Sequence, residues 1–222
     1  MILAAGRGER MRPLTDQAPK PLLRVHGQPM IERHVVRLVG AGIERIVINL
    51  AWLGSQIRDH LGDGSHYGAK IIYSDETPRA LETAGGIFRA LPYLSPGPFA
   101  VVNGDTYTDF PFETLRLGAS RDAHLVLVPN PVYLKGDFGI EQGEARDVAA
   151  ELYTYSGIAV FRAAFFADCV DGVFPLKPLM LRSMAARRCS AQLYTGPWEE
   201  IGTPERLAAL NDRPGAVGSY AP

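Results

Sequence analysis

The amino-acid sequence predicts an α/β protein built around a mostly parallel central sheet. Short apolar runs alternate with stretches in which apolar residues recur every three or four positions, which is typical of consecutive βαβ units. The runs at 46–48 and 99–102 are apolar at every position, as expected of strands buried on both faces. With 222 residues, of which 46% are hydrophobic, the chain can bury one large core.

In the N-terminal half, an apolar strand over 1–5 is followed by a polar loop over 6–21. Apolar residues spaced by three and four positions then predict a helix that begins near Met30 and ends before Gly42, a C-cap glycine. Strands at 46–48 and 71–73 enclose a short helix over 54–61. Gly85 and Gly86 are predicted to open the next helix, and the strand over 99–102 runs directly into Asn103-Gly104-Asp105.

The C-terminal half predicts strands at 125–128 and 157–161, a helix over 176–187 and an extended piece over 194–198. Thr203 is expected to N-cap a last helix with Pro204 at its first position. The segment 130–150, rich in Gly, Pro and charge, supports no firm assignment. We therefore expect one catalytic domain over 1–210 and a flexible C-terminal tail over 211–222, which is polar and rich in Pro and Gly.

Composition argues against several classes of protein. The net charge is −1, and no basic stripe is present, so a nucleic-acid partner is not expected. No apolar run approaches the roughly 20 residues of a membrane helix, and the apolar start is too short for a signal peptide. Cys169 and Cys189 lack metal-ligand spacing, and two thiols in a domain of this size favour a reduced, cytoplasmic setting.

The segment after the first strand carries the strongest functional signal. Small residues there let the backbone approach a ligand, so that successive N–H groups surround phosphate oxygens. The positions expected to contact a nucleotide in this way are Leu3, Ala4, Ala5, Gly6 and Gly8. Arg10 and Lys20 offer cations to the same anion. A Walker loop and a dinucleotide fingerprint are both excluded by the spacing, and a basic surface loop is the alternative.

From Leu3 the sequence reads Leu-Ala-Ala-Gly-Arg-Gly-Glu-Arg-Met-Arg-Pro-Leu-Thr, followed by Pro-Lys-Pro-Leu at 19–22. This resembles the signature of the sugar-1-phosphate nucleotidyltransferase family. The resemblance continues at 81–87, 103–105, 156–158 and 198–203 and covers the chain to about residue 210. It implies a three-layer, Rossmann-like nucleotidyltransferase fold that holds a nucleoside triphosphate in its N-terminal half and a sugar 1-phosphate in its C-terminal half.

The resemblance also implies Mg2+ as a cofactor, with Asp105 as one ligand. The second metal carboxylate of the family is an Asp in the pattern W-x-D-x-G-T, and Glu200 stands there in this chain. The extra methylene moves the carboxylate by roughly 1.5 Å, which alters the expected metal geometry. Asp105 as a turn cap and Glu200 as a surface acid are the alternatives.

Further roles follow from the same resemblance. Arg10 and Lys20 are the catalytic cations, the first on the departing pyrophosphate and the second on charge developing around the α-phosphorus. Additional nucleotide contacts are expected from Gly85, Gly86 and Asn103, and sugar contacts from Gly139, Ser156 and Gly157. For Gly85 and Gly86 the alternative is a turn that contacts no ligand. The usual E-K-P segment ahead of the sugar-pocket region is missing.

The short chain most resembles those members that join UTP and N-acetylmuramate 1-phosphate in bacterial cell-wall, or peptidoglycan, recycling. Two alternatives stay open at this point. One is guanylyl transfer from GTP to mannose 1-phosphate, and the other is a non-catalytic subunit that only binds a sugar nucleotide. Small-molecule substrates, no membrane and a monomer or small homo-oligomer are expected.

Overall fold

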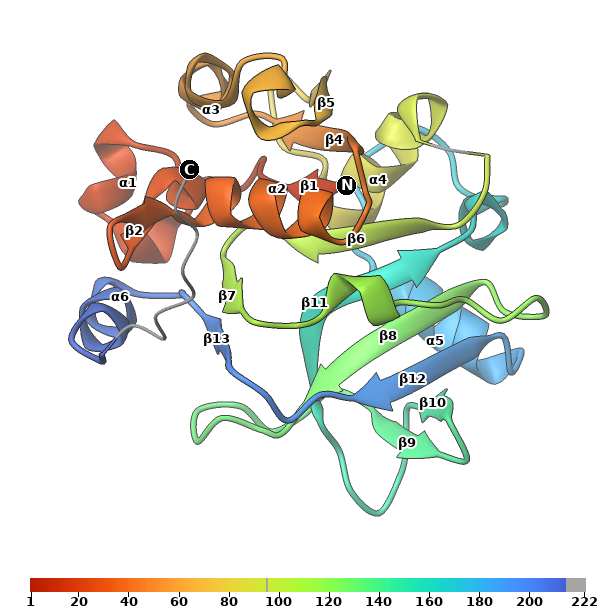
Figure 1. Cartoon of the computed structure of the whole chain (residues 1–222). Helices are drawn as coiled ribbons and strands as arrows, with labels where there is room; N and C mark the ends of the chain where they lie inside the picture. Colours follow the sequence, from red (N-terminus) through yellow and green to blue (C-terminus); the bar gives the residue numbers. More distant parts are fainter. Residues whose placement is uncertain (95, 215–222) are drawn as a thin grey trace.

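The computed structural model describes residues 1–94 and 96–214 and contains a nine-stranded sheet with helices on both faces (Figure 1). Across the sheet the strands follow the order β5 (Lys70–Asp75), β4 (Arg45–Leu50), β1 (Ile2–Leu3), β6 (Phe99–Asn103), β11 (Thr154–Phe161), β8 (Ala123–Val128), β12 (Cys189–Leu193), β10 (Glu144–Arg146) and β9 (Gly139–Glu141). β11 and β10 run against the other strands, which share one direction. The predicted α/β class and mostly parallel sheet are confirmed.

Two hydrophobic cores lie on opposite faces of the sheet, because successive strand residues point to opposite sides. Val102 and Val126 pack with α2 (Met30–Gly40) and α3 (Gly54–Leu61), whereas Val101 and Leu125 pack with α4 (Glu82–Ala90) and α5 (Lys177–Ala185). In Figure 1, α2 crosses in front of the sheet and α5 lies behind it. The three layers predicted from the family resemblance are therefore present.

Several predicted helix ends are confirmed. α3 has the predicted bounds, and Gly42 follows α2 with φ +81°, the left-handed conformation that a C-cap glycine adopts. The last helix, α6 (Pro204–Asn211), begins after Thr203, whose hydroxyl accepts a hydrogen bond from the Arg206 N–H. Asn211 of the predicted tail belongs to this helix, and residues 215–222 of that tail lie outside the described residues.

Other predictions were wrong or incomplete. Gly85 and Gly86 do not open a helix, because α4 begins at Glu82 and places both glycines inside it. The unassigned segment 130–150 contains the antiparallel pair β9 and β10. Of the extended piece predicted over 194–198, only Trp198 lies in a strand, β13 (Trp198–Glu200); the other residues connect β12 to β13, and β12 was not predicted.

The strand order creates a crevice beside β1. The chain goes from β1 to β4 on one side, and β6 is added on the other, so the loops after β1 and β6 separate at the carboxyl ends of these strands. Leu3 pairs with Asn103, and the Gly104 N–H donates to the Leu3 carbonyl at 2.9 Å. A Cβ at Gly104 would lie 2.7 Å from that carbonyl oxygen, so the position requires glycine.

Short two-stranded pairs complete the frame of the crevice. β7 (Thr106–Thr108), which follows Asp105, pairs antiparallel with β13 and sets Glu200 opposite Thr106. The Ile201 N–H donates to the Asp105 carbonyl at 3.1 Å, so the two chain segments stay joined beside the crevice. The hairpin of β2 (Arg24–Val25) and β3 (Gln28–Pro29) and the short helix α1 (Leu14–Gln17) lie in the N-terminal part.

The described part of the chain has no helix with the length and apolar character that crossing a membrane requires.

Candidate active site

A cavity of about 470 Å³ lies at the carboxyl ends of β1 and β6. The residues predicted from the sequence that line it are Leu3, Ala4, Ala5, Gly6, Gly8, Arg10, Lys20, Asn103 and Asp105. These residues come from two segments about 100 positions apart, and the parallel pairing of β1 with β6 brings them together. The structure thus brings the predicted nucleotide residues other than Gly85 and Gly86, both predicted cations and one predicted metal carboxylate to a single cavity.

The loop after β1 is held in place from outside the cavity. Gly8 has φ +67°, and its carbonyl accepts hydrogen bonds from the Thr15 hydroxyl at 2.8 Å and the Met11 N–H at 2.9 Å. The Arg7 guanidinium lies over the Trp52 ring at 3.6 Å, and the Trp52 indole N–H donates to the Thr15 carbonyl at 2.9 Å. The backbone N–H groups of this loop are therefore fixed before any ligand enters, which reduces the entropy lost on binding.

Each predicted catalytic cation is paired with a predicted metal carboxylate. Lys20 Nζ lies 2.6 Å from Asp105 Oδ2, and Lys20 is only 9% exposed, so this pair is largely shielded from solvent. Arg10 reaches Glu200 Oε1 at 3.3 Å with a more exposed side chain. Because each of these four side chains has a partner of opposite charge, the two pairs are neutral without substrate. A polyanion that takes Lys20 and Arg10 would leave both carboxylates for a cation.

The donor set fits a magnesium ion that shares its ligands with a substrate. Asp105 and Glu200, on segments joined by the β7–β13 pair, would offer it hard carboxylate oxygens. Within 1–94 and 96–214, no group of three or more His, Cys, Asp or Glu side chains is arranged to hold a metal. A closed protein cage is thus absent from the described part, and substrate phosphates and water would supply the remaining ligands.

A buried acid in the cavity wall was missed by the sequence analysis. Glu76, at 1% exposure, accepts hydrogen bonds from Asn49 Nδ2 and the Leu81 N–H, both at 2.7 Å. Asn49 Oδ1 in turn accepts from the Ala4 N–H at 2.8 Å, which ties the acid to the nucleotide loop. Burial raises the pKa of the Glu76 carboxyl, and these hydrogen bonds oppose the increase. The available signal was a polar residue near the carboxyl end of each of two strands, Asn49 within β4 and Glu76 directly after β5.

Gly85 and Gly86 are not part of the described cavity lining, which includes Glu82 and Thr83 from the first turn of α4. A Cβ on Gly86 would overlap the Glu76 carboxylate and come within 2.9 Å of Asn49 Nδ2. A Cβ on Gly85 would overlap the Gly172 carbonyl oxygen. The glycine pair thus allows close packing inside a helix, although each glycine there costs about 1 kcal/mol relative to alanine.

We predict that Gly86→Ala lowers the free energy of unfolding by about 1–3 kcal/mol, the usual cost of overpacking. The methyl group must displace Glu76 or Asn49, so the Michaelis constant for the nucleotide should rise as well. Urea unfolding and initial rates at varied nucleotide concentration measure both effects. Gly172→Ala is the matched control, because Gly172 lies outside the described cavity lining and a Cβ there meets no atom within 4 Å. Unchanged stability of Gly86→Ala would contradict this packing role.

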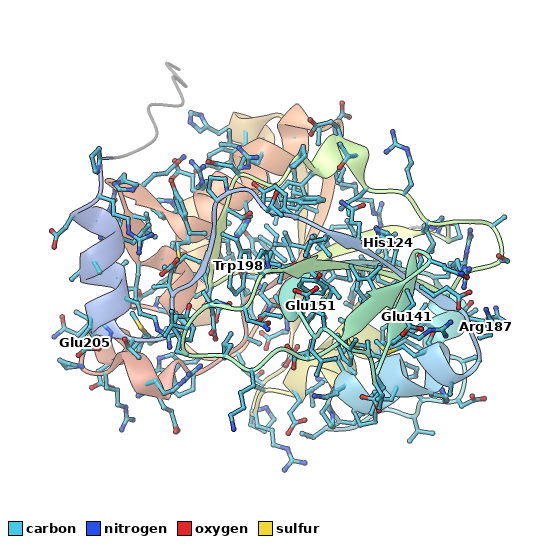
Figure 2. The ribbon with its side chains drawn as sticks, turned by 90° about the horizontal axis from the view of Figure 1, so that it is seen from below. His124, Glu141, Glu151, Arg187, Trp198 and Glu205 are labelled. Atoms are coloured by element: carbon cyan, nitrogen blue, oxygen red, sulfur yellow. The ribbon has the colours of Figure 1, made fainter. Side chains whose placement is uncertain are left out.

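The predicted sugar residues do not form one group. Gly157, with φ +79°, packs against Asn103, since a Cβ there would lie 2.6 Å from Asn103 Nδ2. The Ser156 hydroxyl donates to the Val126 carbonyl at 2.7 Å, and the Ser156 carbonyl accepts from the Trp198 indole at 2.9 Å. Gly139 packs against Ala149 at the edge of the sheet. In Figure 2, Trp198 lies between α6, which carries Glu205, and β9, which carries Glu141.

Comparison with known proteins places this arrangement in a family. The family model described as "Nucleotidyl transferase" matches residues 1–151. An N-acetylmuramate alpha-1-phosphate uridylyltransferase of Neisseria meningitidis serogroup B is 48% identical over 97% of this chain and 98% of its own. A protein of the same name from Caulobacter vibrioides is 33% identical, with 96% and 95% covered.

A solved structure supports the fold separately. HddC from Yersinia pseudotuberculosis, complexed with GMP-PN, aligns with a TM-score of 0.76 at 22% sequence identity and covers 95% of this chain and 96% of that chain. The family match spans more than half of the chain and contains the loop after β1, Lys20 and Asp105. The chain belongs to the nucleotidyl transferase family.

Proposed function

We propose that this protein is a Mg2+-dependent uridylyltransferase that joins UTP and N-acetylmuramate 1-phosphate, releasing pyrophosphate, and that it works in the cytoplasm in peptidoglycan recycling. The observation that carries the choice of substrate is the 48% identity with the Neisseria meningitidis uridylyltransferase over nearly the full length of both chains. The shielded pair of Lys20 and Asp105 at the cavity supports transfer chemistry as opposed to binding alone.

The reaction needs charge neutralisation more than proton transfer. A phosphate oxygen of the sugar 1-phosphate attacks the α-phosphorus in line, and the bond from that phosphorus to the pyrophosphate oxygen breaks. Since the nucleophile is already an anion, no general base is required, and the protein must hold two polyanions together. The fixed N–H groups of 3–8 would bind phosphate oxygens, Lys20 would stabilise charge around the α-phosphorus, and Arg10 would take the pyrophosphate. Bound Mg2+ would neutralise phosphate charge beside Asp105 and Glu200.

A non-catalytic subunit that only binds a sugar nucleotide is the candidate from another class. Such a protein would be free to lose the cations and the carboxylate at the reacting centre. Here Arg10, Lys20 and Asp105 are all present at the cavity, and Lys20 is held within hydrogen-bond distance of Asp105. Burying a lysine carries a desolvation cost that simple retention of the fold does not require.

Glu200→Gln is predicted to raise the Mg2+ concentration for half-maximal rate by about tenfold or more, since one anionic ligand is removed at constant length. Glu200→Asp should shift the same value, because it shortens the carboxylate arm. Rates measured against Mg2+ concentration for the wild type and both variants give the result. Glu199→Gln is the matched control, because Glu199 pairs with Arg213. Three superimposable curves would remove Glu200 from the metal site.

The substrates are tested by pyrophosphate release with each of the four NTPs against a panel of sugar 1-phosphates. We expect the highest kcat/KM with UTP and N-acetylmuramate 1-phosphate. A clear preference for GTP and mannose 1-phosphate would replace the proposed substrates and keep the reaction class. The absence of pyrophosphate release with every pair, in protein that binds a nucleotide sugar, would support the binding subunit.

A further inference from the structure

A cationic side chain outside the predicted set lies beside the cavity. Arg206, in the first turn of α6, has its guanidinium 3.4 Å from the ring centroid of Tyr133. Its Nη1 atom would lie 2.9 Å from a Cβ on Gly202, the residue that brings β13 to the cavity wall. Arg206 is therefore placed where the β7–β13 pair, α6 and the loop after β8 meet, next to the proposed metal carboxylates.

One carboxylate serves two arginines at this point. Glu200 Oε1 lies 3.3 Å from Arg10, and Glu200 Oε2 lies 3.5 Å from Arg206. The side chain of Arg206 is only 23% exposed, and its buried Nη1 has no hydrogen-bond partner in the described structure. If Glu200 turns to a metal ion, Arg206 loses the one acid with which it forms an ion pair in the described structure, and a largely buried cation without an anion is unfavourable.

Both arginines would then be free to bind anionic groups of the substrates. Arg10 lines the cavity and can reach the nucleotide phosphates, whereas Arg206 lies beyond Gly202, on the side of the loop that carries Tyr133. That loop is tied to the start of β11 by Asn130, which donates to the Leu152 carbonyl at 2.7 Å and accepts from the Thr154 hydroxyl at 3.0 Å. Trp198, at the start of β13, donates its indole N–H to the Ser156 carbonyl at 2.9 Å, so the predicted sugar residue Ser156 lies against the strand that carries Glu200, the ion-pair partner of Arg206. Arg206 is thereby linked to the predicted acceptor side.

We propose that Arg206, stacked on Tyr133, recognises the carboxylate of an acidic acceptor sugar and so determines specificity among sugar 1-phosphates. The proposal rests on the proposed function, because N-acetylmuramate differs from N-acetylglucosamine by a lactyl ether that ends in a carboxylate. A planar guanidinium suits a carboxylate through paired N–H donors. Tyr133 fixes the plane of that group through a cation–π contact, which limits the freedom lost on binding.

The test compares kcat/KM for N-acetylmuramate 1-phosphate and N-acetylglucosamine 1-phosphate, both with UTP and Mg2+. For Arg206→Gln, the ratio of these two values should fall by about 10- to 100-fold, the range expected for losing a hydrogen bond to a charged group. Arg206→Lys keeps the charge without the paired donors and should give an intermediate ratio. Tyr133→Leu, which leaves the arginine in place, should lower the ratio less than Arg206→Gln does.

Arg213→Gln is the matched control. Arg213 follows α6 and pairs with Glu199 at 3.6 Å, so the ratio should equal that of the wild type. If Arg206→Gln lowers kcat/KM equally for both sugars, the proposal is overturned. Arg206 would then act on the phosphate that both sugars carry, or only as the ion-pair partner of Glu200. If Arg206→Gln fails to fold, the ratios of Arg206→Lys and Tyr133→Leu decide, and wild-type ratios in both would overturn it. A wild-type enzyme that uses only N-acetylglucosamine 1-phosphate would overturn the proposed substrate together with this role.

Discussion

Asp105→Asn is expected to lower kcat by about 10³-fold or more. Asp105 follows β6 at the strand-order crevice, lines the cavity and holds Lys20 at 2.6 Å. Loss of its charge removes an anionic ligand from the proposed Mg2+ site, and metal stabilisation of a transition state is worth several kcal/mol, with about 1.4 kcal/mol for each factor of ten in rate. The amide keeps the size of the side chain, so the cavity should keep its shape.

A control on the same strand pair separates chemistry from stability. Asp109, directly after β7, forms ion pairs with Arg33 and Arg37 of α2 and lies outside the described cavity lining. Asp109→Asn should therefore lower the melting temperature while kcat stays within a few-fold of the wild type. Asp105→Asn should show the opposite pattern. A near-normal kcat for Asp105→Asn at saturating Mg2+ would contradict the assignment of Asp105 as a metal ligand.

Lys20→Met should lower kcat by about 10²- to 10³-fold, the usual cost of losing one donor to charge that develops in the transition state. The same variant should bind a divalent cation more tightly in the absence of nucleotide, because Lys20 is the internal counter-ion of Asp105 and its removal frees that carboxylate. Electron paramagnetic resonance of Mn2+ titrated into nucleotide-free protein measures this affinity without any turnover.

Lys70→Met is the control for this substitution, since Lys70 is exposed at the amino end of β5, whereas the cavity lies at the carboxyl ends of the parallel strands. It should leave both turnover and Mn2+ affinity unchanged. Weaker Mn2+ binding by Lys20→Met, or an unchanged kcat, would show that the lysine does not act against Asp105 and the α-phosphate.

The N-terminal half of the fold could be predicted because its signals are local. The strand β6 is apolar at four consecutive positions and leads into Asn103-Gly104-Asp105, and α3 was predicted to the residue. The strand β12 could not be predicted, because its polar residues are satisfied only by a partner strand. Ser190 and Gln192 of β12 form hydrogen bonds of 2.9 and 3.0 Å with the two ring nitrogens of His124, which lies on the neighbouring strand β8. Without that partner, the segment has the composition of a loop.

The residues of the site could likewise be predicted where their signals are local in the sequence, and not where they depend on contacts between distant segments. The loop after β1, Lys20 and Asp105 came from motif spacing and family resemblance, and the structure brings them to one cavity. The pairing of Arg10 with Glu200 spans 190 positions, and the link from Glu76 through Asn49 to Ala4 joins three separate strand ends. Contacts of this range depend on how the sheet is ordered. Gly85 and Gly86 show the reverse case, where a recognised motif has a packing role that only Glu76 and Gly172 reveal.

The most direct measurement follows two labels of UTP in parallel reactions with N-acetylmuramate 1-phosphate and Mg2+. If the protein catalyses nucleotidyl transfer, phosphorus-32 at the α position of UTP will appear in the nucleotide sugar, and phosphorus-32 at the γ position will appear in pyrophosphate. The two products should form in equal amounts and only when both substrates are present. Label from the γ position in orthophosphate or in the sugar, or no conversion by protein that still binds UTP, would contradict the proposed reaction.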